Sequence, residues 1–512
     1  MASILPSGFF SHLTTGSLLT TAFGAVSCYA SIRCFYHLYL HPASKFPGPR
    51  LAAISNVWYA YHWITGKYAM AVEKAFEEYG DVVRVAPNEV AFLTPQAASD
   101  IYGAHTKHLE HFTKTDFVEM GKDDQGIAWE RDPVKHRNTS KRLSPAFSMK
   151  SIKAKEPTMH KYIDLFVKMM KKDGGGEAGV ELRIWTDWVA MDISAELAYS
   201  REMHQLDEMK SGPFLKAIWG VNFFVTIHQI CKKFPLFTPI QFLFVPPSAV
   251  ISEFQARKLA TKELETRIER QGKTEHLDHF ETLVPAGAPK PTKEEKKELE
   301  VLAAQLLIAG YEPISSQFLC TIMFSLQEPE TYKRLVNEIR ETFTRYEDIT
   351  PEALTPLRYL HASLMEALRL TVIGGTGMPR VSPGATVDGN YISKGVYVQY
   401  GHFAFTRSTQ YFHEPRSYRP ERWLPEDHLY WKSAFKSDAR ESFFPFSQGP
   451  RGCPGMALAW HETRLFIAKV LWSFDVEMLP DQNIVFERDF NIHAMWEKPK
   501  FWVRFHPVVR DE

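Results

Sequence analysis

Cysteine is scarce in this chain of 512 residues, which contains five, at positions 28, 34, 231, 320 and 453. Five scattered thiols are too few for a disulfide framework, so the folded part is predicted to work in a reducing compartment. An excess of either charge is also missing, because 60 basic residues balance 60 acidic ones. A nucleic-acid partner would require a surplus of basic residues, and none is predicted.

Charged residues are absent from the first 32 positions, apart from the titratable His12. Within them the run LTTGSLLTTAFGAVSCYASI, residues 13–32, is just long enough to cross a bilayer, which takes about 20 residues. A cleaved signal peptide is the alternative, but it would carry positive charge before the apolar run. Here the basic residues follow, beginning with Arg33. This order predicts a single-pass membrane anchor over residues 1–38, with the rest of the chain on the cytoplasmic side.

Internal repeats and low-complexity segments are absent as well, so no break divides the chain after residue 50. Residues 39–50 contain the stretch LHPASKFPGPR, whose prolines cannot continue a helix and predict a hinge. Residues 51–512 are predicted to be one large domain, mainly α with a small β portion. Its longest helix is predicted to begin at a capping box formed by Thr292 and Glu295. That helix is apolar on nearly every side, which is typical of a helix crossing the middle of a protein.

The last cysteine lies in a stretch that is unusual for ordinary packing. In FFPFSQGPRGCPGMALAWHE, residues 443–462, Cys453 lies among glycines and prolines directly before an apolar helix. An unpaired cysteine is usually a buried small hydrophobic residue, and a metal ligand is the alternative. A helix N-terminus lowers the pKa of a thiol through its dipole and free N–H groups, which favours a thiolate ligand.

Five positions of this stretch, Phe446, Gly449, Arg451, Cys453 and Gly455, resemble the cysteine-ligand loop of the cytochrome P450 family, the haem-thiolate monooxygenases. The resemblance implies that family's fold, with haem b held between the central helix and the helix after Cys453. It implies that Cys453 is the axial ligand of the iron, and that Phe446 and Gly455 belong to the haem-binding loop. Arg451 is then expected to form charge-assisted bonds to a haem propionate. The glycines let the backbone approach the flat macrocycle closely.

The resemblance extends over nearly the whole chain. Glu366 and Arg369, with Arg422 as a third member, are similar to the family's structural clamp under the haem. Taken alone, such an i,i+3 pair would be ordinary chemistry of a helix surface. Arg380 lies where the family places another propionate-binding arginine, and a surface cation is its alternative role.

A further segment, HRNTSKRLSPAFS, is similar to the one from which a Trp or His reaches the propionates, and it predicts this role for His136. The arginine usual four positions after that histidine is replaced by Ser140. The candidates to substitute for it are Lys141, Arg142 and Arg137.

The central helix departs from the family pattern at the oxygen-binding groove. The family pattern Ala/Gly-Gly-x-Asp/Glu-Thr-Thr/Ser corresponds to AGYEPISS, residues 309–316. The resemblance implies that Ala309 and Gly310 lie against the haem. The position of the threonine, however, is taken by Pro313, which removes a hydroxyl and a backbone hydrogen bond.

The lost hydroxyl matters because cleavage of the O–O bond requires protons, and the threonine normally organises their delivery. Three replacements remain open. Glu312 can act with ordered water, a hydroxyl can come from Ser315 or Ser316 one turn further on, or the substrate can supply its own hydroxyl.

The function implied by the resemblance is a membrane-anchored monooxygenase of the endoplasmic reticulum that oxidises an apolar small molecule. Its electrons would come from an NADPH-cytochrome P450 reductase, with cytochrome b5 as a further candidate partner. A haem-thiolate isomerase, lyase or oxidative cyclase is the alternative enzyme, and Pro313 favours it. A haem-binding protein without turnover is the alternative outside enzymes. Similarity of the proline hinge to that of fungal members favours secondary metabolism.

Overall fold

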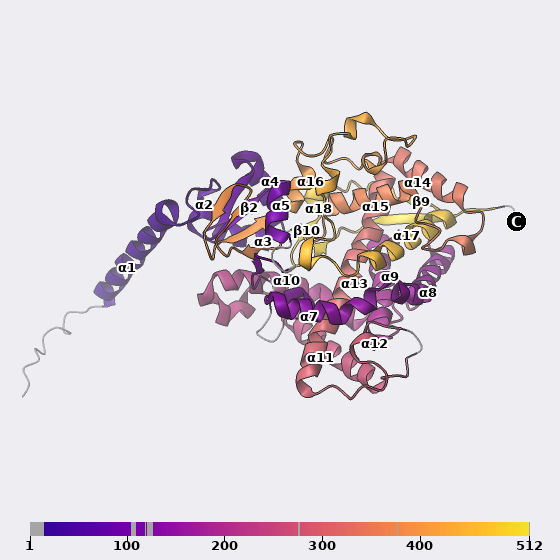
Figure 1. Ribbon diagram of the computed structural model, residues 1–512, viewed down its shortest axis with the longest axis horizontal. Coiled ribbons are helices and arrows are strands. Elements are labelled where there is room, and N and C mark those ends of the chain that lie inside the picture. The colour runs from indigo at the N-terminus through magenta and orange to yellow at the C-terminus, as the bar shows by residue number, and fades with distance from the viewer. Residues whose placement is uncertain are drawn as a thin grey trace, which may run out of the picture.

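The structure is a computed structural model that describes residues 15–103, 109–117, 119, 126–274, 277–375 and 377–510. Helices form most of the body (Figure 1). The α-helices are α1 (Thr15–Phe35), α2 (Arg50–Ile54), α3 (Val57–Ile64), α4 (Tyr68–Tyr79), α5 (Pro95–Tyr102), α6 (Gly126–Trp129), α7 (Pro133–Leu143), α8 (Met149–Asp173), α9 (Leu182–Tyr199), α10 (Pro213–Lys233), α11 (Pro247–Glu269), α12 (Phe280–Leu283), α13 (Lys293–Gln327), α14 (Pro329–Thr342), α15 (Arg358–Thr371), α16 (His402–Arg407), α17 (Met456–Ser473) and α18 (Phe486–Asp489).

Short strands make up the small β portion. The strands are β1 (Val82–Ala86), β2 (Glu89–Phe92), β3 (Thr113–Lys114), β4 (Val180–Glu181), β5 (Arg380–Val381), β6 (Ala385–Val387), β7 (Asn390–Ile392), β8 (Tyr397–Tyr400), β9 (Phe474–Met478), β10 (Asn491–Ile492), β11 (Trp496–Glu497) and β12 (Trp502–Pro507). The largest sheet has the order β1-β2-β8-β5-β3. In it β2 and β8 run parallel, and the other neighbours are antiparallel. The mainly α prediction is confirmed.

The predicted long helix is α13, and it crosses the centre of the molecule (Figure 1). The capping box is confirmed, because the Thr292 hydroxyl accepts a hydrogen bond from the Glu295 N–H and the Glu295 carboxylate accepts one from the Thr292 N–H. Nearly every residue from Tyr311 to Ser325 is buried. Helices α9 and α17 pack against α13, and their apolar side chains form one core with it.

Two pairings of the largest sheet bring distant segments together. Strand β3 pairs with β5 so that Lys114 lies opposite Arg380, and Arg380 also lies opposite Val398 of β8. Cross-strand neighbours of this kind project from the same face of a sheet. Two basic residues that are far apart in the sequence therefore meet at the edge of the body.

The N-terminal helix α1 projects from the body (Figure 1), and its described apolar side chains are exposed, Phe23 by 75% and Ile32 by 62%. A one-turn π-helix, η1 (Tyr36–Leu40), continues it to the hinge. By length and composition, α10 is the one helix in the described ranges that is apolar enough to cross a membrane, and most of it is buried in the body. Helix α1 falls short of that apolarity, so the predicted anchor is not established.

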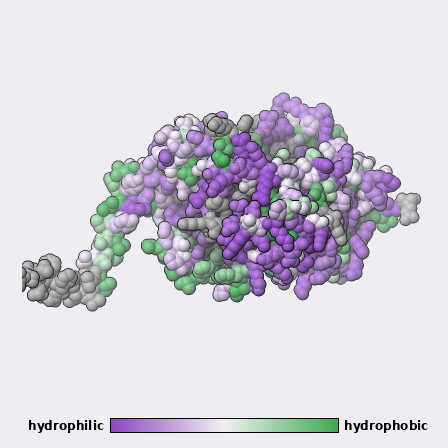
Figure 2. Space-filling view, turned by 60° about the horizontal axis from the view of Figure 1, so that its bottom comes forward, coloured by the Kyte–Doolittle hydropathy of each residue, from purple (hydrophilic) through white to green (hydrophobic). Residues whose placement is uncertain are grey.

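Apolar surface lies on the body as well as on α1 (Figure 2). The 3₁₀ segment η4 (Pro235–Phe244) follows α10 and exposes Leu236 by 91% and Leu243 by 78%. The adjoining helix α11 exposes Phe254. The end of α10 is tied to the start of α3 by a hydrogen bond from the Asn56 side chain to the Lys233 carbonyl, so this apolar surface belongs to the part of the body from which α1 emerges.

Candidate active site

Cys453 lies in a tight loop directly before α17. Its backbone N–H donates to the carbonyl of Phe446 at 2.8 Å, which folds the loop back on itself. Gly455 is the N-terminal cap of α17 and has no capping side chain, so the first N–H groups of the helix remain available to an anion. Burial raises the pKa of the Cys453 thiol, while the Gly455 N–H lowers it. The residue as a whole is nevertheless exposed.

Gly449 fixes the shape of this loop. Its φ is +68°, and a Cβ at this position would lie 2.2 Å from the carbonyl oxygen of Tyr102 at the end of α5. Only glycine fits both conditions. The Phe446 ring packs against Trp460 of α17, with ring centroids 5.5 Å apart. The loop is therefore held between α5 and α17 independently of any ligand.

Arg451, two residues before the cysteine, is buried and ion-paired. Its Nε donates to Oε1 of Glu110 at 2.7 Å, Nη2 contacts the same carboxylate oxygen, and Nη1 donates to the carbonyl of Glu130 at 2.6 Å. The other Glu110 oxygen has no hydrogen-bond partner in the described part of the chain. Sequence reasoning missed Glu110, because no motif marks it.

Arg380 and Lys114 lie beside this pair as the sheet register requires. The Arg380 guanidinium donates only to the carbonyls of Met378 and Pro379, and the Lys114 ammonium donates to the carbonyl of Ala128. Neither forms an ion pair within the described ranges. Burial lowers the pKa of Arg380 to about 10 and holds the pKa of Lys114 well below its usual range.

His136 of α7 is buried next to the same group of charges. Burial lowers its pKa to about 4, and the cations of Arg451 and Lys114 contribute to the shift. The structure thus brings together His136, Arg380 and Arg451, the three residues that the sequence predicts as propionate ligands. The remaining cation of the cluster is Lys114. Arg137, Lys141 and Arg142, the candidates to replace the missing arginine, are exposed on α7.

This cluster fits a cofactor that carries carboxylates. Arg451 is paired with Glu110 and also feels the charges of Glu130 and Asp132, whereas Arg380 and Lys114 bond only backbone carbonyls among the described residues. Buried cations are normally paired, because the desolvation of an unpaired charge costs several kcal/mol. Two further carboxylates, the number that a haem carries as propionates, would complete the pairing.

The middle of α13 presents two faces. Ala309 and the preceding Ile308 are exposed, in contrast to the buried residues that follow them. Gly310 faces α9 instead, because a Cβ on it would lie 2.6 Å from the Ser194 hydroxyl oxygen. That Ala309 and Gly310 lie against the cofactor stays a prediction, and Gly310 in addition permits close packing of α9 on α13.

The helix continues through Pro313 without a break. Because proline has no N–H, the carbonyl of Ala309, four residues earlier, lacks its helical donor. Glu312 is buried, and its Oε1 accepts a hydrogen bond from the Ser316 hydroxyl at 3.1 Å. Burial raises the pKa of Glu312, while the Lys498 cation and the bond from Ser316 oppose the shift.

Ser315 does not turn towards Glu312. Its hydroxyl donates to Asp187 of α9 and accepts from the Lys498 ammonium, whose Nζ lies 2.7 Å away. Of the two predicted serines, Ser316 therefore contacts the acid, and Ser315 belongs to a buried ion pair that the sequence did not indicate.

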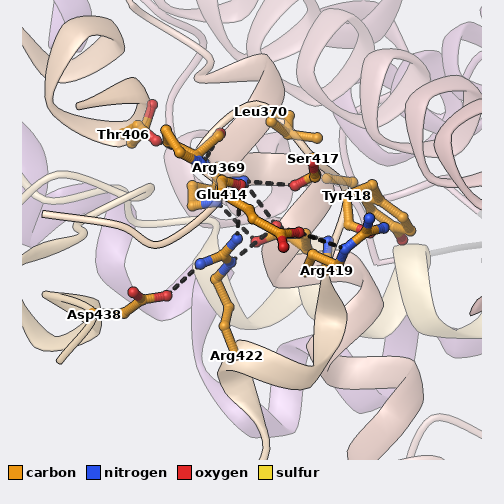
Figure 3. A network of polar contacts seen from close by, with 12 residues as sticks. Arg369, Leu370, Thr406, Glu414, Ser417, Tyr418, Arg419, Arg422 and Asp438 are labelled. Carbon is orange, nitrogen blue, oxygen red and sulfur yellow. Dashed lines mark hydrogen bonds and ion pairs between the residues drawn. The ribbon is translucent and has the colours of Figure 1, made fainter. Parts of the chain in front are cut away.

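The clamp predicted from the sequence is formed by fully buried groups (Figure 3). Arg369 donates two bonds to the Glu366 carboxylate at 2.8 and 2.7 Å, and Arg422 donates one at 3.0 Å. Burial alone would raise the pKa of Glu366, but the two arginines lower it to about 2. Arg422 also pairs with Asp438. The alternative of an ordinary helix-surface pair is wrong here.

The whole sequence is similar to three fungal proteins, and residues 47–505 match the family described as Cytochrome P450. Cytochrome P450 monooxygenase TwmD of Talaromyces wortmannii is 47% identical over 500 residues, covering 97% of this chain and 98% of that protein. Cytochrome P450 monooxygenase poxC of Penicillium oxalicum is 35% identical, with 94% and 93% covered. Cytochrome P450 monooxygenase BOA3 of Botryotinia fuckeliana is 32% identical, with 93% and 94% covered.

Proposed function

This chain belongs to the cytochrome P450 family, and we propose that it inserts one atom of O₂ into an apolar small molecule of fungal secondary metabolism. It is an oxidoreductase of the monooxygenase type, and its cofactor is haem with a cysteine thiolate ligand. The observation that carries the proposal is an exposed cysteine, Cys453, two residues after Arg451, whose neighbours Arg380 and Lys114 are cations that form no ion pair within the described ranges.

Cys453 would hold the iron, and Arg451, Arg380, Lys114 and His136 would receive the propionates. A thiolate ligand pushes electron density towards the iron and favours cleavage of the O–O bond, which is the chemistry that the bound group supplies. The clamp of Glu366, Arg369 and Arg422 would stiffen the protein under this site without touching the reactants.

Proton delivery is assigned to Glu312 and Ser316. Their hydrogen bond joins a carboxyl of raised pKa to a hydroxyl on the face of α13 next to Pro313. A general acid works best when its pKa lies near the working pH, and burial moves Glu312 in that direction. The carbonyl of Ala309, which Pro313 leaves without a helical donor, offers an acceptor for a water or a substrate hydroxyl.

The proposed electron donor is an NADPH-cytochrome P450 reductase, with cytochrome b5 as a second candidate. The proposed location is the membrane of the endoplasmic reticulum. Support comes from two apolar surfaces in the same part of the molecule, the exposed side of α1 and the segment η4. An amphipathic or apolar surface of this kind binds the boundary of a bilayer. Residues 51–512 would then form the catalytic domain, behind the hinge at 39–50 and the anchor at 1–38.

A haem-thiolate isomerase, lyase or oxidative cyclase is the second candidate function. The observation that favours it is Pro313, because an enzyme that does not cleave O–O by proton delivery does not need the threonine hydroxyl. The two functions differ in whether the product gains an atom from O₂.

The ligand assignment is tested with Cys453→Ala. The ferrous–CO complex of the wild type should show the red-shifted Soret band of a thiolate-ligated haem, and the variant should lose it. The exposed Cys28→Ala is the matched control and should keep the band. Retention of the band by Cys453→Ala would contradict the assignment.

The reaction class is tested with isotopically labelled O₂ and the metabolites that a deletion strain accumulates. One labelled oxygen atom in the product supports the monooxygenase. An unlabelled, rearranged or cyclised product supports the second candidate function.

Membrane attachment is tested by removing residues 1–38. The shortened protein should be extracted by high salt, with residual binding through η4, while the full chain should require detergent. Recovery of the full chain in the soluble fraction without detergent would contradict the anchor.

A further inference from the structure

A buried charged cluster lies where three distant segments meet beside Glu312. Helix α9 contributes Asp187, α13 contributes Ser315, and Lys498 comes from the turn between β11 and β12. The side chains of Asp187 and Lys498 are 1% and 5% exposed. No motif of the sequence marks either residue.

The contacts of this cluster are short and mutual. Lys498 Nζ lies 2.8 Å from Asp187 Oδ1 and 2.7 Å from the Ser315 hydroxyl, which itself donates to Asp187. A lysine ammonium has three donors, and these two contacts use two of them. Tyr311, one residue before Glu312, extends the cluster, because its hydroxyl hydrogen-bonds to Asp187 and accepts a bond from the Trp219 indole at 3.0 Å.

The charges of the cluster do not balance. Asp187 and Glu312 are two buried acids, and Lys498 is the one cation among the described residues that acts on Glu312. Lys498 is bonded directly to Asp187, so Glu312 receives its charge only through space. Glu312 is therefore the buried acid of this group that has no direct ion partner among the described residues, and burial raises its pKa.

The chain comes to the surface on both sides of the buried Lys498. Glu497, directly before it, is 47% exposed, and Lys500 is exposed two residues later, whereas Ser315 and Asp187 are buried.

We propose that Lys498 and Asp187 are positioning residues for Glu312, and that together they set its protonation state in a helix that lacks the threonine. The proposal rests on the relay through Glu312 described above. Lys498 stabilises the ionised form of Glu312, and Asp187 holds Lys498 in place and disfavours that ionised form.

The surroundings of Glu312 are otherwise sparse in charge. From α13 the titratable neighbours are Tyr311 and Cys320, both of which burial keeps protonated by raising the pKa. From the segment of β10 and β11 the backbone N–H of Trp496 bonds the carboxylate, and from α9 only Asp187 acts on it. Lys498 and Asp187 are thus the charges through which the protein can tune this acid.

The test measures the holoenzyme by infrared spectroscopy across a pH series. The band of a protonated carboxylic acid is assigned to Glu312 by its loss in Glu312→Gln, and its midpoint is then followed in the other variants. Lys498→Met should raise the midpoint by about 1 pH unit or more, because an opposite charge nearby is removed. Asp187→Asn should lower it, and Lys498→Arg should keep the wild-type value. The pH profile of product formed per NADPH should shift in the same directions.

Lys500→Met is the matched control and should match the wild type in both measurements. Opposite shifts from Lys498→Met and Asp187→Asn distinguish positioning from a general loss of packing, which would act alike in both. An unchanged midpoint in both variants would overturn the proposal, and if Lys498→Met does not fold, Asp187→Asn and Lys498→Arg decide alone. Full coupling in Glu312→Gln would instead overturn the relay on which the proposal rests.

Discussion

Two buried charge clusters of this protein have opposite designs. The clamp near the cysteine loop contains two acids, Glu366 and Asp438, and two bases, Arg369 and Arg422, with both Glu366 oxygens bonded. The cluster beside Pro313 contains two acids, Asp187 and Glu312, and one base, Lys498. The pKa of Glu366 is lowered to about 2, whereas that of Glu312 is raised.

The difference separates structure from chemistry. A balanced cluster with satisfied hydrogen bonds fixes its charges and holds segments together, and it has no proton to exchange near neutral pH. A buried acid without a direct cation partner has its pKa raised by desolvation, and perturbed acids of this kind gather at functional sites. A substitution in the clamp should therefore destabilise the fold. A substitution in the cluster beside Pro313 should keep the fold intact and slow the reaction.

The largest effect is expected from Arg369→Ala. The change leaves the fully buried Glu366 short of one cation, and breaking a buried pair costs about 3–5 kcal/mol. Chemical denaturation should show this loss in the free energy of unfolding, or the holoprotein should fail to accumulate. Arg345→Ala is the control, because Arg345 forms an exposed i,i+3 pair with Asp348 and its loss should change little. Equal stability of the two variants would contradict the role of the clamp.

The second effect concerns Glu312→Gln. The fold and the CO spectrum should remain, while the rate of product formation should fall by about 10²–10⁴-fold, because a general acid is lost. Peroxide, NADPH and product measured together should show electrons diverted to peroxide. Glu298→Gln, an exposed change on the same helix, serves as control. If product per NADPH stays at the wild-type level, the excess acid is not part of the relay.

A third cluster, with cations in excess, gives a smaller effect on cofactor retention. Lys114→Met or Arg380→Leu should each speed the transfer of haem to an apo-globin acceptor by about tenfold or more, because a bond to a charged group contributes about 1.5–3 kcal/mol. Arg137→Leu, on the exposed face of α7, should not change the transfer rate. An unchanged transfer rate in both Lys114→Met and Arg380→Leu would mean that these cations do not hold the propionates.

The smallest effect is the opposite pH dependence of the two acids. The pKa of Glu366 is lowered from 4.5 to about 2, so the stability it contributes is present above about pH 4.5 and is lost as the pH falls towards 2. The pKa of Glu312 is raised above 4.5, so its burial becomes more costly as the pH rises from that value. The free energy of unfolding of Glu312→Gln should therefore increase relative to that of the wild type as the pH rises above 4.5. A constant difference across this range would contradict the raised pKa.

The local patterns of the sequence predicted a large part of the site. The loop around Cys453 depends on residues a few positions apart, and Gly449 with its φ of +68° shows why the glycine is needed there. Glu366 and Arg369 are one helical turn apart, so their contact follows from the helix itself. The capping box at Thr292 is likewise a contact across three residues.

Other parts of the site depend on contacts between distant segments. Lys114 lies in a strand of two residues and joins the cation cluster only because β3 pairs with β5. The contact of Lys498 with Asp187 spans 311 positions of the chain. Periodicity could not tell that Gly310 faces α9 while Ala309 is exposed, because both lie on a helix that is apolar on nearly every side.

The sequence by itself indicated the mainly helical fold, the cysteine loop and the Glu366–Arg369 pair, since each depends on residue types at short, fixed spacing, while the third clamp member, Arg422, and the loss of the threonine at Pro313 came from the resemblance to the family. The tertiary structure alone decided which cations surround Arg451, which serine contacts Glu312 and which charges act on that acid. The physical reason is that the pKa of a buried group is set by burial and by the charges that the fold brings within a few ångströms. Neither can be deduced from the residues next to it in the sequence.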